Sequence, residues 1–151
     1  MATKSADRIS RLPNDVRVHI LTFLPLREAA KSSVLSSKWR NLWTNLPTLV
    51  IDESICKSDV VDRVMLNIQG VLLLHGGPLK DFSLSHSRLG PETYHILRML
   101  PYQNLESLTI QAGVYNCKAT NQVFSSFYRL KKLFLYWCEF TFSPISFEGF
   151  E

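Results

Sequence analysis

The 151-residue sequence predicts a mixed fold, between the α+β and α/β classes, in which three short helices precede a repeat solenoid with a parallel sheet. Two observations support this prediction. Apolar residues recur at helical spacing between prolines in the first fifty residues, and a short hydrophobic unit recurs every 25 or 26 residues in the second half. We expect a helical module over residues 7–52, a linking amphipathic helix within 53–78, and repeats over 79–151.

The composition is that of a globular chain. Hydrophobic residues make up 46% and charged residues 20% of the sequence, and no apolar run approaches the ~20 residues that cross a bilayer. We expect no secretory signal, because the first ten residues hold no apolar stretch. Cys56, Cys117 and Cys138 are odd in number and widely spaced, which favours thiols in the cytosol or nucleus.

The net charge of +4 is unevenly distributed. Residues 1–50 hold eight Lys and Arg against three Asp and Glu, whereas residues 51–151 hold nine against ten. A basic module beside a nearly neutral body favours an acidic partner for the first segment. A solvated surface that happens to be rich in Lys and Arg explains the same charge, so both interpretations stay open.

Three short helices are predicted in the first segment. The first begins at Leu12-Pro13, since proline is favoured at the first helical position, and it ends before Pro25. A second runs over about 26–33, and a third, with a serine cap, carries apolar residues at i, i+3 and i+4 before Pro47. A module of this size cannot bury all its large apolar side chains. Those left over are expected to face the downstream segment or another protein.

The residue order of this segment, L-P-N-D-V-x-x-x-I-L-x-x-L-P-L-x-E-A-x-x-x-S-x-L-S-x-x-W-R-x-L-W, resembles the F-box. The F-box is the module of cullin–RING ubiquitin ligases that binds a Skp-type adaptor. The resemblance covers about a third of the chain, and it implies an acidic adaptor as partner and, through it, a cullin. The adaptor-binding residues that it implies are Leu12, Pro13, Val16, Ile20, Leu24, Pro25, Leu26, Leu35 and Trp39.

Residues 59–74 predict an amphipathic helix that faces the core. Their apolar side chains share one helical face, Ser58 can cap the start, and Gly76-Gly77-Pro78 follows the end. A membrane or partner role is the minority interpretation, because the opposite face is short and carries mixed charge.

An internal repeat follows this helix. The units 79–84, 105–110 and 130–135 each read L-x-x-[LF]-x-[LI], and the third continues to Phe140 with Cys138 at the Asn/Cys position of a leucine-rich repeat. In such repeats the apolar residues point inward from one strand per unit, and the strands form a parallel sheet. The leucines are therefore expected to be scaffold, and Gly90-Pro91 with residues 92–100 a returning helix.

Two positions depart from the repeat pattern, because Ser87 and Gly113 stand where Asn or Cys would bond the neighbouring backbone. A recognition surface would use the outward positions, although the sequence ranks none of them and identifies no substrate. These positions are Lys80, Asp81, Ser83, Glu106, Ser107, Thr109, Lys131, Lys132 and Phe134.

An F-box followed by a helix and leucine-rich repeats resembles a large plant class of F-box/leucine-rich-repeat proteins, whose members typically carry more repeats. The resemblance implies a substrate-recognition adaptor of an SCF-type ubiquitin ligase, which presents a target through its repeats. Solenoids need a terminal cap, and the apolar tail Thr141–Glu151 offers no obvious one. We therefore expect a truncated, aggregation-prone member of the class.

No motif predicts catalysis, a metal or a cofactor. The four histidines lie far apart, in no zinc-ligand spacing, and the chain has no nucleophile motif and no phosphate-binding glycine loop. Two alternatives remain: an F-box protein without ligase function, and a basic helix-turn-helix that binds nucleic acid. The third predicted helix argues against the latter, because it commits its two tryptophans to packing. We expect no nucleic-acid or membrane partner.

Overall fold

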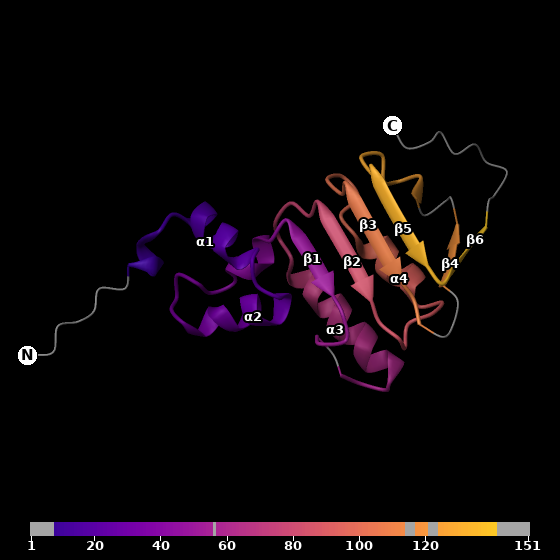
Figure 1. Cartoon of the computed structure of the whole chain (residues 1–151), viewed down its shortest axis with the longest axis horizontal. Helices are drawn as coiled ribbons and strands as arrows, with labels where there is room; N and C mark the ends of the chain where they lie inside the picture. The colour runs from indigo at the N-terminus through magenta and orange to yellow at the C-terminus, as the bar shows by residue number, and fades with distance from the viewer. Residues whose placement is uncertain (1–7, 56, 114–116, 121–123, 142–151) are drawn as a thin grey trace, which may run out of the picture.

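The computed structural model describes residues 8–55, 57–113, 117–120 and 124–141. A helical region lies at the N-terminal end, and α3 (Val61–Leu74) and α4 (Thr93–Met99) lie behind a parallel sheet (Figure 1). The mixed fold with an N-terminal helical region and a parallel sheet is therefore confirmed. The expectations for Cys56 and for the tail beyond Thr141 concern residues outside these ranges.

The N-terminal region consists of short helices separated by prolines and turns. Pro13 and Pro25 precede α1 and α2 with extended backbones, and the Pro25 carbonyl accepts a hydrogen bond from the N–H of Ala29 at 2.9 Å. The first two predicted helices are confirmed. The helices of this region are η1 (Ile9–Arg11), α1 (Asn14–Leu21), α2 (Leu26–Lys31), η2 (Ser32–Val34) and η3 (Leu42–Asn45).

The third predicted helix is wrong in form. Residues 37–41 are turns, and only the short 3₁₀ helix η3 follows them. The cause is Asn41, whose φ of 60° is left-handed and cannot belong to a right-handed helix. Lys38 and Arg40 lie in these turns, so the segment offers no recognition helix for a nucleic-acid groove.

The larger sheet consists of four parallel strands in the order β1-β2-β3-β5. The three predicted repeat units supply β2, β3 and β5, in equal register: Phe82 lies opposite Leu108, and Leu108 opposite Leu133. A second parallel sheet, which the sequence does not predict, pairs β4 with β6. The strands are β1 (Thr48–Ile51), β2 (Asp81–Ser85), β3 (Ser107–Gln111), β4 (Cys117–Thr120), β5 (Lys132–Tyr136) and β6 (Cys138–Thr141).

Strand β1 lies inside the segment that was expected to be a helical module. Residues 46–51 read L-x-x-L-x-I, the order of the other units, but they precede Leu79 by 33 positions rather than 25 or 26. The long spacing hides this unit from a search for a fixed period. The intervening chain includes α3, whose 14 residues make this the longest connection in the sheet.

One backbone pattern recurs between neighbouring strands of the larger sheet. In each step a single carbonyl accepts hydrogen bonds from two successive N–H groups of the next unit, at 2.7–3.1 Å. We call this the shared-carbonyl pattern. The accepting carbonyls are those of Pro47, Lys80 and Glu106, and the donors are Lys80 and Asp81, Glu106 and Ser107, and Lys131 and Lys132, respectively.

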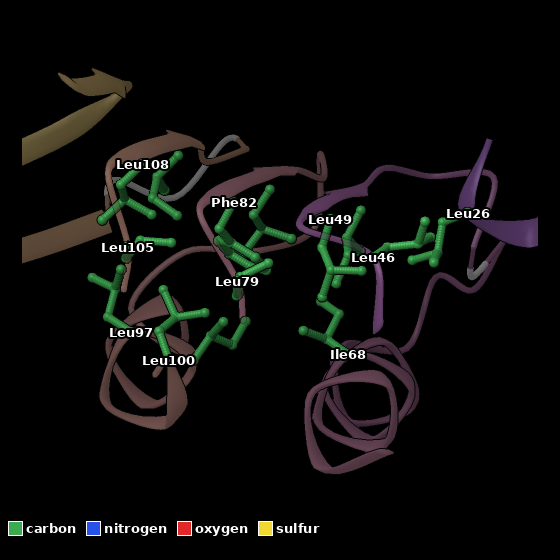
Figure 2. Close-up of a cluster of buried hydrophobic side chains, with 14 of the residues drawn as sticks. Leu26, Leu46, Leu49, Ile68, Leu79, Phe82, Leu97, Leu100, Leu105 and Leu108 are labelled. Carbon is green, nitrogen blue, oxygen red and sulfur yellow. The ribbon is translucent and has the colours of Figure 1, made fainter. Parts of the chain in front are cut away.

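The main core lies between the sheet and its helices. The side chain of Ile68 on α3 lies near Leu49, and Leu97 on α4 and Leu100 just after it lie near the inner ends of the next units (Figure 2). The first leucine of every unit is buried, as the repeat pattern requires. These residues are Leu46, Leu79, Leu105 and Leu130.

The chain that follows α3 joins the sheet to the helical region. The N–H groups of Gly76 and Gly77 both donate to the Thr44 carbonyl, at 3.0 and 3.1 Å, and a ring nitrogen of His75 lies 2.8 Å from the Leu46 carbonyl oxygen. A Cβ atom at Gly77 would stand 2.7 Å from the Cα of Asn45, so glycine permits this close approach.

Gly113→Ala should lower the free energy of unfolding. A close contact at this glycine also explains why the repeat pattern is broken here. Its N–H donates to the Leu89 carbonyl at 2.8 Å, and a Cβ would stand 1.6 Å from the carbonyl oxygen of Ser87. The two loops would have to separate, at a cost of about 1–3 kcal/mol or more. Urea unfolding measures this change.

Gly70→Ala is the matched control, because a Cβ there meets no atom within 4 Å. Alanine in the interior of α3 should raise the free energy of unfolding by up to ~1 kcal/mol. Equal stability of the two variants would contradict the close packing of the loops at Gly113.

Candidate protein-docking surface

Large apolar side chains are exposed over the helical region. Phe23, Val34 and Leu35 are 75%, 85% and 70% exposed, and others stand one turn apart on α1. So many exposed apolar groups in a region this small are typical of a protein-interaction site. The members, which we call the N-terminal apolar surface, are Ile9, Val16, Ile20, Phe23, Leu24, Val34 and Leu35.

Trp39 fixes the helices beneath this surface. It is 5% exposed, and its indole Nε1–H donates to the hydroxyl of Ser10 in η1 at 2.8 Å. Ser10 and Ser36 also place their hydroxyl oxygens 3.3 Å apart. The indole thus fills the space between the helices, while its one polar atom is satisfied by a buried serine.

Arg17 is a buried cation that ties three segments together. Its Nε donates to the Leu12 carbonyl at 3.0 Å, and its other nitrogens donate to the Lys38 carbonyl and to the side-chain oxygen of Asn14. Its guanidinium carbon also lies 6.0 Å from the centre of the Trp39 ring. A buried charge needs such partners, and here they close the turn at residue 38 onto α1.

The structure divides the predicted docking residues into surface and core. Pro13, Val16, Ile20, Leu24, Pro25 and Leu35 are exposed, and Leu12 is half-buried. Leu26 is only 7% exposed, and Trp39 is buried as well. Both residues belong to the hydrophobic core of the isolated chain, and their assignment to adaptor binding stays a prediction.

Three exposed residues were not among the predicted docking residues. Phe23 follows Ile20 by three positions on the same apolar stripe, and its ring packs edge-on against His19 with centroids 5.1 Å apart. Its spacing could therefore have identified it. Ile9 and Val34 have no such signal, because neither belongs to a regular helical stripe.

Positive side chains accompany the apolar groups. Among the described residues before position 46, one basic residue, Arg17, is buried, and Lys31 pairs with Glu28 at 2.7 Å. The remaining cations are exposed and give the region a positive field. They are Arg8, Arg11, Arg27, Lys38 and Arg40.

Metal and membrane sites find no support in the part of the chain that the structure describes. Within it, no group of three or more His, Cys, Asp and Glu side chains could hold a metal ion. In the same ranges, no helix combines the length and apolar character needed to span a bilayer.

Comparison with known protein families decides what this region is. Residues 9–51 match the family described as the F-box domain. The chain carries an F-box domain. The match ends at Ile51, the last residue of β1, so the F-box segment includes the first strand of the sheet.

Relatives with the same domain come from Arabidopsis thaliana. An F-box/FBD/LRR-repeat protein is 38% identical over 155 residues, covering 97% of this chain and 36% of the relative. Two F-box/LRR-repeat proteins are 44% and 47% identical, over 53% and 55% of this chain and 23% and 18% of the relatives. The F-box chain is thus a homologue of plant F-box/LRR-repeat proteins, and it spans little more than a third of their length at most.

Trp39→Ala should unfold or strongly destabilise the F-box segment. The substitution removes a buried indole and the hydrogen bond that it donates to Ser10, and deletions of this size cost roughly 3–5 kcal/mol. Thermal unfolding followed by circular dichroism measures the loss. Trp137→Ala is the control, because its side chain is 72% exposed and surface substitutions cost about 0.5 kcal/mol or less. Equal stability of the two variants would contradict the packing of Trp39.

Proposed function

We propose that the chain is a substrate-recognition adaptor of an SCF-type cullin–RING ubiquitin ligase and that its N-terminal apolar surface binds a Skp-type adaptor. F-box/LRR-repeat proteins are generally adaptors rather than enzymes, and we extend this to the present chain. The proposal places it in the cytosol, the nucleus or both.

The observation that supports this most strongly is the exposed apolar surface within the F-box match. Burial of apolar area drives association, at about 25 cal/mol per Å² removed from water. Val16, Ile20 and Leu24 follow one another along α1 and its end, so a partner can cover them together. Trp39 and Arg17 hold the backbone beneath them, so little ordering is needed on binding.

Charge supports the same partner. The exposed cations around the F-box favour an acidic surface, which is what the family resemblance implies for the adaptor. Opposite charges at the rim of an interface mainly raise the association rate, and salt screens them. The apolar groups are therefore expected to set the affinity and the cations the rate.

For the sheet, we propose that the units are leucine-rich repeats that present a target. Their equal register, buried first leucines and shared-carbonyl pattern support this assignment. The outward-facing residues alternate with the buried ones, and on β5 they include the exposed aromatic rings of Phe134 and Tyr136. A target would contact this outward side.

Ile20→Glu with Leu24→Glu should lower the affinity for a Skp-type adaptor by at least ~30-fold, since one central interface anchor is worth about 2 kcal/mol. Leu12-Pro13→Ala-Ala should also abolish capture. Leu66→Glu is the control, because it places the same charge at an exposed leucine of α3. Calorimetric titration with purified adaptor measures the affinity, and circular dichroism confirms folding.

Unchanged affinity of the folded Ile20→Glu, Leu24→Glu variant would overturn the assignment of the surface. A pull-down that probes adaptor and cullin together separates the ligase role from the alternative without it. Adaptor captured without cullin would favour an F-box protein that has no ligase function.

A further inference from the structure

A cleft of about 510 Å³ opens where the strands of the larger sheet end. Its walls come from segments that follow β1, β2 and β5 and from the end of β3. Polar and aromatic side chains that line the cleft are Glu53, His86, Ser87, Gln111 and Trp137. Parallel strands bring their carboxyl ends to one edge, so residues distant in sequence meet there.

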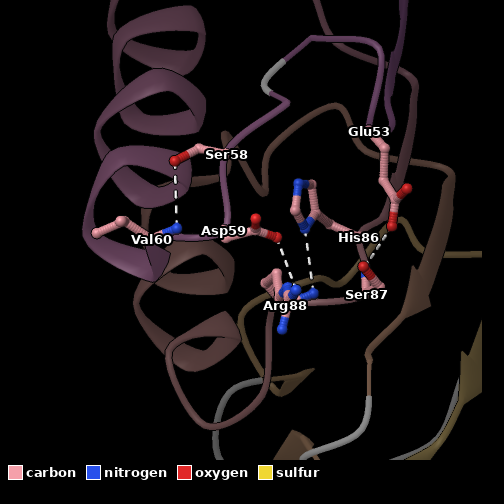
Figure 3. A network of polar contacts seen from close by, with 7 residues as sticks. All are labelled: Glu53, Ser58, Asp59, Val60, His86, Ser87 and Arg88. Atoms are coloured by element: carbon pink, nitrogen blue, oxygen red, sulfur yellow. Dashed lines mark hydrogen bonds and ion pairs between the residues drawn. The ribbon is translucent and has the colours of Figure 1, made fainter.

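Glu53 supplies the negative charge of the cleft. Its Oε1 accepts a hydrogen bond from the backbone N–H of Ser87 at 3.1 Å, which holds the carboxylate at the wall (Figure 3). Hydrogen bonding by the Ser87 side chain and backbone, followed by the positive charges nearby, lowers the pKa of Glu53. The carboxylate is therefore ionised at neutral pH, and the second oxygen can accept from a ligand.

Two basic residues, His86 and Arg88, lie near Glu53 in the loop that carries Ser87. Nη2 of Arg88 pairs with Oδ1 of Asp59 at 2.6 Å, on the other side of the loop (Figure 3). Nδ1 of His86 accepts a hydrogen bond from the Arg88 backbone N–H at 3.2 Å. Of the described residues that line the cleft, Glu53 is the one Asp, Glu, Lys or Arg, so the cleft itself contributes a negative charge.

Trp137 supplies an aromatic face at the same cleft. It follows β5 with φ of 58°, a left-handed backbone that is costly for a bulky residue. The turn from β5 to β6 accounts for the left-handed backbone of residue 137. Glycine or asparagine would adopt this backbone at lower cost than tryptophan. Because the indole is largely exposed, packing does not explain why a tryptophan stands at this position, whereas contact with a ligand does.

We propose that this cleft binds the side chain of an arginine in a protein partner. The guanidinium group would donate to the Glu53 carboxylate and stack on the Trp137 indole, while the Gln111 side chain offers an uncharged acceptor. A carboxylate and an exposed tryptophan that line the same cleft suit a flat cation that both accepts stacking and donates hydrogen bonds. The inference rests on the proposed function only in naming that partner as the presented target.

The test uses the full chain and two small probes in a saturation-transfer NMR titration. N-acetyl-arginine methylamide carries the cation, and N-acetyl-citrulline methylamide has almost the same shape without the charge. We expect saturable binding of the arginine probe, with a shift of the Trp137 indole N–H signal, and at least fivefold weaker binding of the citrulline probe. Equal binding of both probes, or no binding of either, would overturn the proposal.

Variants then locate the site. Glu53→Gln and Trp137→Ala should each weaken binding of the arginine probe about fivefold, the size of one exposed ion pair or cation–π contact. Glu106→Gln is the matched control, because it removes the same charge at the opposite edge of the sheet. Wild-type affinity in Glu53→Gln, or equal losses in Glu53→Gln and Glu106→Gln, would refute the assignment.

This experiment and the test of the F-box can fail separately. Neither Glu53 nor Trp137 belongs to the N-terminal apolar surface, so both variants should bind the Skp-type adaptor as the wild type does. Loss of adaptor binding by Ile20→Glu, Leu24→Glu with no binding of the arginine probe would retain the proposed function and reject the cleft. Binding of the arginine probe by a chain that binds no adaptor would retain the cleft and reject the proposed function.

Discussion

The carbonyl of Pro47 accepts hydrogen bonds from the N–H groups of the second and third residues of the next unit, and the carbonyls of Lys80 and Glu106 repeat this arrangement. Each unit is thereby placed by the one before it, and the series begins at the end of the F-box segment. β1 is the edge on which β2 is built, and Leu46 and Leu49 are covered by the same core that continues through the later units. The N-terminal region and the sheet therefore depend on each other for burial of apolar area.

The helical region compensates for its size with buried polar contacts. A hydroxyl satisfies the Trp39 indole, and carbonyls and an amide oxygen surround the Arg17 guanidinium. These bonds orient short helices that have little core of their own. As a result, Val16, Ile20 and Leu24 can remain exposed without loss of order, which is what a surface that binds another protein requires.

The sheet separates scaffold from recognition by the alternation of its strands. Inward residues such as Phe82 and Leu108 are buried, while the outward positions of the same strands carry polar groups. At the carboxyl ends of the strands, side chains from several segments line one cleft. Glu53 and Trp137 follow the first and last strands of the larger sheet, and both line the cleft at this end of it.

Much of this arrangement was predictable from local order. Proline positions and helical spacing predict α1, α2 and α3, and the recurring L-x-x-[LF]-x-[LI] unit predicts β2, β3 and β5 as parallel neighbours. The ordered F-box residues likewise predict the exposed Val16, Ile20 and Leu24. These features follow from sequence because each is encoded by a few nearby residues with a fixed period.

The remaining features depend on contacts between distant segments, and only the tertiary structure decided them. Asn41 turns left-handed and breaks the third helix, Leu26 is buried where its motif position suggested exposure, and β1 is a strand because β2 lies beside it. In the sequence, Arg17 looks like one more surface cation. In the structure it is buried, and its guanidinium donates to the backbone carbonyl of Lys38. Burial, left-handed backbone and the placement of Glu53 and Trp137 at one cleft are properties of the packed chain, because each depends on segments that lie far apart in the sequence.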